Sequence, residues 1–200
     1  QNGLVTSNDN IIGSNIATGS LVFSTTTTTT TDIYGMYNFS SDDWTANNNS
    51  IGGISVTNLG ASGTFIIYGM RANTSTTKAS NLTLNLIGGT VANSIQLTAT
   101  GVSSQIIGFQ TPNSNCNLSR NSIRNLTTNI GTGTTTSASV IGICLTSTTP
   151  NHNISENNIY NLKNSNTYVV LSRTEGVAYK RVMKNNRLKN KITLISDNPQ

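Results

Sequence analysis

The stretch NLSRNSIRNL at residues 117–126 returns 36 residues later as NISENNIYNL at residues 153–162. Six of the ten positions are identical, and Leu118 is exchanged only for Ile154. The other differences fall at Arg120, Ser122 and Arg124. Such a duplication marks a structural repeat, in which the unchanged positions form the buried pattern and the changed positions face outward.

A second pattern, two apolar residues followed by glycine and a further apolar residue, occurs four times with the same period. The successive glycines are 34, 39 and 34 residues apart: Gly35, Gly69, Gly108 and Gly142. A fixed period of this length is typical of solenoids, propellers and arrays. We therefore expect the four glycines to stack in one column, where a side chain would obstruct the backbone.

The repeat stretches contain both strand and corner signals. Leu82, Leu84 and Leu86 alternate with polar residues, which predicts a strand with one buried face. The spacing of apolar residues in 118–126 is five and then three, which indicates a corner near Asn121. Asparagine tolerates left-handed backbone angles, and its amide can bond to an equivalent asparagine one coil away. We assign structural corner roles to Asn121 and Asn157.

The composition favours an all-β chain. Only 10% of the residues are charged and 34% are hydrophobic, while Asn, Thr, Ser and Gly fill much of the rest. These polar residues weaken helices, whereas Thr, Val and Ile suit strands. The predicted fold is a right-handed parallel β-helix, a solenoid with a repeat of 34–39 residues. The alternative is a β-sandwich, whose strands would have no reason to keep that period.

The net charge of +5 comes entirely from the end of the chain. Residues 1–171 carry five basic and five acidic groups, whereas residues 172–200 carry seven basic and two acidic groups. We therefore divide the chain into a repeat region, 1–167, and a basic segment, 168–200, which reads as short strands forming a β-hairpin-like end. The basic segment lacks an aromatic series for base stacking, so a nucleic-acid partner is not expected.

Cysteine and histidine are too few for a metal site or a disulfide framework. The chain has Cys116, Cys144 and His152, with no paired metal-ligand spacing. His152 lies in the repeat phase of Cys116, and parity predicts that Cys144 points outward from its strand. Whether the two cysteines pair is left open. No apolar run is long enough to span a membrane, and the low-charge composition favours an exported or surface location.

Residues 33–165 resemble the repeats of right-handed parallel β-helix proteins exported to the surface of Bacteroidetes-type bacteria. The resemblance is carried by NNIYNL at residues 157–162 and VIGI at residues 140–143. It implies an extracellular or cell-surface repeat region, adhesin-like or associated with carbohydrate.

Residues 168–199 resemble the C-terminal part of the LexA-type self-cleaving serine–lysine peptidases. The motifs are GVAYKRV at residues 176–182, followed by LISDNP at residues 194–199. The resemblance implies that Lys180 is the general base of a dyad. The nucleophilic serine of that family is missing, because the corresponding distance falls on Gly142 and Cys144.

These observations leave three hypotheses for function. The leading one is a non-enzymatic structural or binding module that presents polar faces to a carbohydrate or a surface protein and needs no cofactor. The second is a polysaccharide lyase or hydrolase on the same fold, with Asp42, Asp43, Trp44 and Arg71 as binding or acid groups and calcium as a possible cofactor. The third is a fragment of a LexA-like peptidase that lacks its nucleophile.

Overall fold

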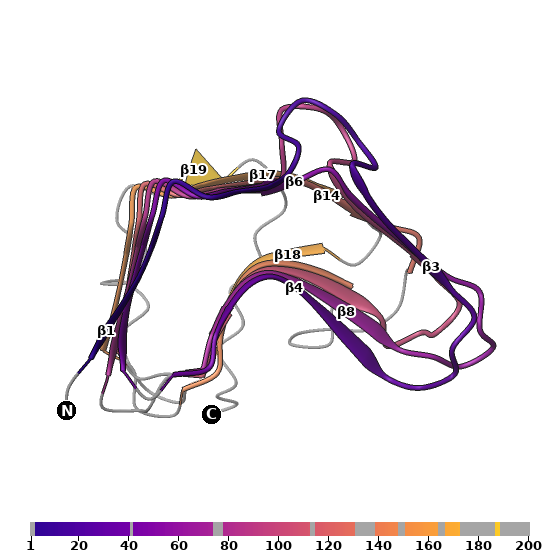
Figure 1. The fold of residues 1–200 in the computed structure, drawn as a ribbon, viewed down its shortest axis with the longest axis horizontal. Helices are drawn as coiled ribbons and strands as arrows, with labels where there is room; N and C mark the ends of the chain where they lie inside the picture. Colours follow the sequence, from indigo (N-terminus) through magenta and orange to yellow (C-terminus); the bar gives the residue numbers. More distant parts are fainter. Residues whose placement is uncertain are drawn as a thin grey trace, which may run out of the picture.

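The computed structural model describes residues 3–40, 42–73, 78–112, 115–130, 139–147, 151–163, 167–172 and 187–188. Over these residues the chain is a parallel β-solenoid, with its strands stacked in three sheets (Figure 1). The predicted solenoid is therefore confirmed. Every strand pairing is parallel, which a sandwich of antiparallel sheets would not give.

Sheet A forms one side of the solenoid. It consists of five strands in the order β1 (Leu4–Asn8), β5 (Asp43–Asn47), β9 (Ala79–Thr83), β13 (Asn115–Ser119) and β16 (Asn151–Ser155). Asn117 pairs with Asn153 and Leu118 with Ile154. The duplicated sequence stretches therefore lie directly side by side.

Sheet B forms the second side, in two rows. One row contains β2 (Ile11–Gly13), β6 (Ser50–Gly52), β10 (Leu86–Ile87), β14 (Ser122–Thr128), β17 (Asn158–Lys163) and β19 (Arg187–Leu188). The other contains β3 (Leu21–Thr25), β7 (Ile54–Asn58) and β11 (Ile95–Ala99), which pairs with the second half of β14. In the first three coils a bend or loop separates the rows, whereas β14 spans both.

Sheet C closes the solenoid. Its strands are β4 (Thr31–Asn38), β8 (Phe65–Ala72), β12 (Gln105–Thr111), β15 (Val140–Leu145) and β18 (Thr167–Ser172). Each coil contributes to all three sheets: coil 1 is β1–β4, coil 2 β5–β8, coil 3 β9–β12, coil 4 β13–β15 and coil 5 β16–β18. Sheet C extends to Ser172, five residues beyond the boundary at residue 167 expected from charge.

The corner between sheets A and B is a column of left-handed residues. Their φ angles are 55 to 58°, and the column consists of Asp9, Asn48, Leu84, Arg120 and Glu156. The corner predicted near Asn121 is therefore confirmed. The continuous strand predicted through Leu84 is wrong, because Leu84 occupies the corner and is 55% exposed while Leu82 is buried.

Next to this corner runs a ladder of asparagines. The backbone N and Nδ2 of Asn85 both donate to Oδ1 of Asn121, at 2.9 and 3.0 Å, and Nδ2 also donates to the carbonyl oxygen of Ala46 at 2.9 Å. Asn121 donates in the same way to Oδ1 of Asn157, at 3.0 and 2.9 Å. The predicted bonding between equivalent asparagines of successive coils is confirmed.

The four repeated glycines stack in one column, as predicted. A Cβ atom added to Gly35, Gly69 or Gly108 would lie 2.5 to 2.6 Å from the carbonyl oxygen of the next glycine in the column. It would also strike an inward-pointing isoleucine of sheet B: Ile51, Ile87 or Ile123. The glycines thus let sheet C approach sheet B closely. Sheet C bends inward there, as the arch of β4, β8 and β18 shows in Figure 1.

The space between the sheets is filled by one continuous apolar core. Its largest buried side chains include Trp44, Ile51, Met70, Leu82 and Phe109. Cys116 lies in this core, whereas Cys144 packs with Tyr68, Ile107 and Ile141 in a separate cluster. Cys144 therefore points outward, as parity predicts. Both cysteines are free thiols.

Candidate functional site

The bend of sheet C gathers aromatic side chains on its outer side. Ile33 and Met36 both pack against the core, so the inward positions on either side of Gly35 are three residues apart. Tyr34 and Tyr37 consequently share the outer side, and their rings stack with centroids 4.4 Å apart and an interplanar angle of 12°. Tyr34 also stacks on Tyr68 of the next coil, at 5.1 Å and 10°.

Arg71 lies among these three rings. Its Cζ atom is 4.8 Å from the ring centroid of Tyr68, 5.7 Å from that of Tyr37 and 5.8 Å from that of Tyr34. A guanidinium held over aromatic faces is stabilised by the negative potential of the rings. Its Nη1 donates to Oη of Tyr34 at 3.1 Å and lies 3.6 Å from Oδ2 of Asp32. The Tyr34 hydroxyl in turn donates to the same carboxylate oxygen at 2.8 Å.

The environment keeps both inner tyrosines protonated at neutral pH. Burial raises the pKa of Tyr68 to about 12. Burial, together with the hydrogen bond to the Asp32 carboxylate, raises the pKa of Tyr34. The phenols therefore act as neutral hydrogen-bonding groups, while Arg71 and Asp32 offset each other's charge.

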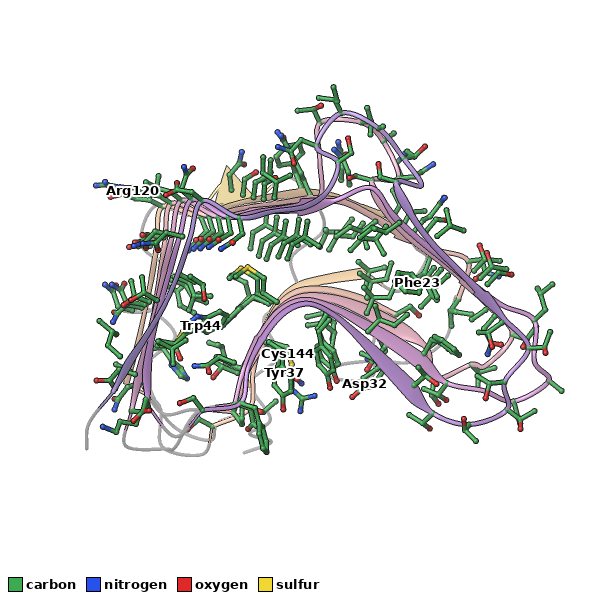
Figure 2. The ribbon with its side chains drawn as sticks, in the orientation of Figure 1. Phe23, Asp32, Tyr37, Trp44, Arg120 and Cys144 are labelled. Atoms are coloured by element: carbon green, nitrogen blue, oxygen red, sulfur yellow. The ribbon has the colours of Figure 1, made fainter. Side chains whose placement is uncertain are left out.

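The outer edge of the group is open to solvent. Tyr37 is 40% exposed and Phe39 is 71% exposed, with ring centroids 5.7 Å apart and planes inclined by 47°. Nδ2 of Asn73 reaches Oη of Tyr37 at 3.5 Å. We call Asp32, Tyr34, Tyr37, Phe39, Tyr68 and Arg71 the aromatic cluster. Figure 2 shows its Tyr37 and Asp32 on the outer side of the bend.

The outer side of the bend becomes apolar along the solenoid axis. Ile107 and Ile141 follow Tyr68 in register, and Gln110 and Cys144 follow Arg71. Burial raises the pKa of Cys144 to about 11, although a hydrogen bond with Gln110 opposes the shift. Cys144 is therefore a thiol at neutral pH and not the thiolate that nucleophilic chemistry requires.

The residues predicted to form a polysaccharide site do not come together. Oδ1 of Asp42 accepts from the backbone N of Gly3 at 3.1 Å, and Oδ1 of Asp43 accepts from the backbone N of Ala79 at 2.9 Å. Both lie beside sheet A, whereas Arg71 lies on sheet C. Trp44 is 1% exposed and its Nε1 donates to Oγ of Ser7 at 3.2 Å, so its ring cannot stack on a ligand (Figure 2).

The remaining predictions concern Lys180, metal ligands, His152 and membrane spans. Lys180 lies outside the described residues, so its role as a general base stays a prediction. Over the described ranges, no three His, Cys, Asp or Glu side chains gather as calcium or another metal would require. His152 pairs in register with Cys116, as its repeat phase predicts. No described helix is long and apolar enough to cross a membrane.

Sequence reasoning identified Arg71 but missed its partners Asp32, Tyr34, Tyr37 and Tyr68. A signal was present, because Tyr34 and Tyr68 occupy the second position in the first two glycine motifs. That position faces outward in both coils. Tyr37 and Arg71 then stand three residues further on and pair in register.

Comparison of the chain with protein-family models, with curated proteins and with solved structures found no match, so the two family resemblances rest on the quoted motifs alone.

Proposed function

We propose that the chain is a non-enzymatic binding module and that the aromatic cluster is its carbohydrate-binding surface. The observation that carries this proposal is the exposure of Tyr37 and Phe39 beside an ordered arrangement of Arg71, Asp32 and Tyr34. Aromatic faces combined with a few fixed polar groups are typical of small-ligand sites. The stacking and hydrogen bonds hold these side chains in place before a ligand arrives, which lowers the entropic cost of binding.

The chemistry of the cluster fits a sugar ring. One face of a pyranose presents C–H groups, which pack on an aromatic face such as that of Phe39 or Tyr37. Its hydroxyls can both donate and accept, and Asp32 and Asn73 offer an acceptor and a donor beside the rings. Because Asp32 balances Arg71, neutral polysaccharides are the expected ligands.

The placement of the predicted catalytic residues gives the two enzymatic hypotheses less support. A lyase or hydrolase on this fold would need Asp42, Asp43 and Arg71 to converge, and they belong to different sheets. A peptidase would need a nucleophile near Lys180, and Cys144 is a buried thiol of raised pKa. An exported or cell-surface location accords with a carbohydrate ligand and remains part of the proposal.

Affinity electrophoresis tests the proposal. The purified chain is run through gels that contain neutral or acidic polysaccharides, and at least one neutral polysaccharide should retard it. Replacing Tyr37→Ala and Phe39→Ala together should weaken that retardation by about tenfold, since lost aromatic contacts are worth ~1.5 kcal/mol.

The matched control is Tyr160→Ala. Tyr160 also partners an arginine, since it accepts from Nη1 of Arg124 and lies with its ring centroid 5.7 Å from Cζ of that residue, but on sheet B. This variant should bind like the parent chain. Retardation that survives the double replacement, or the absence of retardation by every polysaccharide, would refute the assignment.

A further inference from the structure

The outer face of sheet A carries a row of asparagines that is separate from the buried ladder. Asn81, Asn117 and Asn153 pair in register on β9, β13 and β16. The next residue on each of these strands is buried in the apolar core, so alternation turns the three asparagines outward. We call these three residues the outer asparagine row.

An open groove with a volume of about 460 Å³ lies along this row. Its lining includes the outer asparagine row together with Ala79 and Asn115. Ala79 and Asn115 pair with each other in register and stand two residues before Asn81 and Asn117. They therefore form a second row, about 7 Å from the first. Because both rows cross the strands, the groove between them follows the solenoid axis.

Most of the carboxamide groups in the groove are available to a ligand. Nδ2 of Asn153 donates to Oδ1 of Asn117 at 3.2 Å. Within the described chain, this is the one hydrogen bond made by the side-chain amides of the groove. In the buried ladder, by contrast, both amide atoms of Asn121 are bonded to neighbouring coils. The groove thus offers donors and acceptors that the fold itself does not use.

The lining of the groove is uncharged at neutral pH. It contains no acidic residue, lysine or arginine, and burial lowers the pKa of its one histidine, His152, to about 4. The Asp43 carboxylate stands at the Ala79 side, where its Oδ1 accepts from the backbone N of Ala79 at 2.9 Å. An uncharged ligand is therefore favoured, since an anionic one would meet a like charge.

The spacing of the amides defines the shape of the ligand. Neighbouring strands lie about 4.7–4.9 Å apart, so the outer asparagine row presents one carboxamide per coil at this interval. An extended chain of β-1,4-linked pyranoses advances by a similar distance per sugar and carries hydroxyls along both edges. A hydroxyl donates and accepts, as a carboxamide does. Each sugar can therefore meet an equivalent amide in each successive coil.

We propose that this groove is a second carbohydrate-binding site, in which a neutral β-1,4-linked polysaccharide chain lies along the solenoid axis with one sugar on each coil. Three coils contribute a strand to the outer asparagine row, so three successive sugars should make contact. The ligand class is that of the proposed function, but the site lies on sheet A and the aromatic cluster on sheet C. Either site can therefore fail without the other.

Nuclear magnetic resonance of the isotope-labelled chain tests this proposal and separates the two sites. Titration with cellohexaose should shift the side-chain amide signals of Asn81 and Asn117 and the backbone amide signals of β9 and β13. Maltohexaose, whose α-linked chain coils, should not shift these signals. The affinity at the groove should rise from the disaccharide to the trisaccharide of the β-linked series and then level off.

Two variants confirm the groove without disturbing the core. Asn81→Ala combined with Asn117→Ala removes two amides and should weaken binding of cellohexaose at the groove at least about tenfold. Ala79→Leu keeps every amide, fills the groove and should also block binding. The matched control is Ser119→Ala, which alters an outward side chain of β13 that does not line the groove and should leave the affinity unchanged. All variants should unfold at the urea concentration of the parent chain.

The outcomes are distinct. Shifts confined to the region of Tyr37 and Phe39 would overturn the groove and leave the aromatic cluster as the carbohydrate site. Shifts confined to the groove would support this inference and count against the cluster. Equal shifts with maltohexaose, unchanged affinity of the groove variants, or no shift with cellohexaose would each refute an extended β-linked chain in the groove.

Discussion

At the scale of single residues, the buried asparagines explain how polar side chains can stand inside a corner. Asn121 is 5% exposed, and its Oδ1 accepts two hydrogen bonds from Asn85 while its Nδ2 donates to Asn157 and to the carbonyl oxygen of Leu82. Each amide is thus satisfied by the coils on both sides. A buried polar group left without its partner costs about 1–3 kcal/mol.

Asn121→Ala should therefore destabilise the chain strongly. It removes the acceptor for two buried N–H groups of Asn85, and we expect a loss of about 2–4 kcal/mol in the free energy of unfolding. Urea unfolding followed by circular dichroism measures this. The matched control is Asn153→Ala, which alters an exposed asparagine and should change the free energy by less than about 0.5 kcal/mol. Similar losses for both variants would contradict the role given to the ladder.

His152 is a second residue whose environment determines its contribution. Neither ring nitrogen has a hydrogen-bond partner or is open to solvent within the described structure. Burial lowers the pKa of His152 to about 4. Because that pKa lies below its ordinary value, the unfolded chain takes up the proton first as the pH falls. Stability is therefore full above about pH 6.5 and is lost progressively toward about pH 4.

His152→Gln should remove this pH dependence. Between about pH 7.5 and about pH 5 the parent chain should lose about 1–2 kcal/mol of stability, a value reduced for the partial solvent access of the imidazole. The variant should lose much less over the same range, because glutamine does not titrate. Urea unfolding at the two pH values compares them, and an equal loss in both chains would place the effect on other groups.

At the scale of elements, the repeat period of the sequence predicted which residues stack in columns from coil to coil. It did not always predict the backbone conformation at each position. The glycine column and the asparagine ladder follow from residues that recur at 34–39-residue intervals. Leu84 shows where the local pattern was misleading. Leu82, Leu84 and Leu86 alternate with polar residues, as they would in a strand with one buried face. Alignment with Arg120 places it at the corner instead, and the repeat outweighs the local alternation because each coil must turn where its neighbours turn.

The aromatic cluster could not be predicted for a different physical reason. Strict alternation would put Tyr34 and Tyr37 on opposite faces. The bend at Gly35 interrupts the alternation, so both rings reach the same side and enclose Arg71 of the next coil. The bend depends on close approach between sheets B and C, which is a property of the cross-section. The interior position of Trp44, which is 1% exposed and packs in the core, likewise depends on the cross-section.

The corner column itself supplies a test at this scale. Leu84 adopts a φ angle of 57° with its side chain 55% exposed, whereas coil 2 has Asn48 at the same position. Asparagine tolerates this conformation better than leucine. Leu84→Asn should therefore stabilise the chain by about 0.5–1 kcal/mol, measured by thermal unfolding. Leu84→Ala keeps the strain and should give no gain, so a gain from alanine alone would show that removal of the exposed side chain is responsible.

At the scale of the whole molecule, a stack of coils is held together by contacts between neighbours. Among the described strands, a coil with neighbours on both sides is bonded at both strand edges, whereas coil 1 is bonded at one. In such a quasi-one-dimensional structure, opening begins at an end, because an end coil breaks one interface and an inner coil breaks two. Stability should therefore be graded along the solenoid axis.

Hydrogen exchange can measure this gradient. In dilute solution, amides of β3 and β4 in coil 1 should exchange at least about tenfold faster than those of β11 and β12 in coil 3. Uniform exchange across the coils would mean that the solenoid opens as one cooperative unit. Coil 1 would then be no less stable than the coils at the centre of the solenoid.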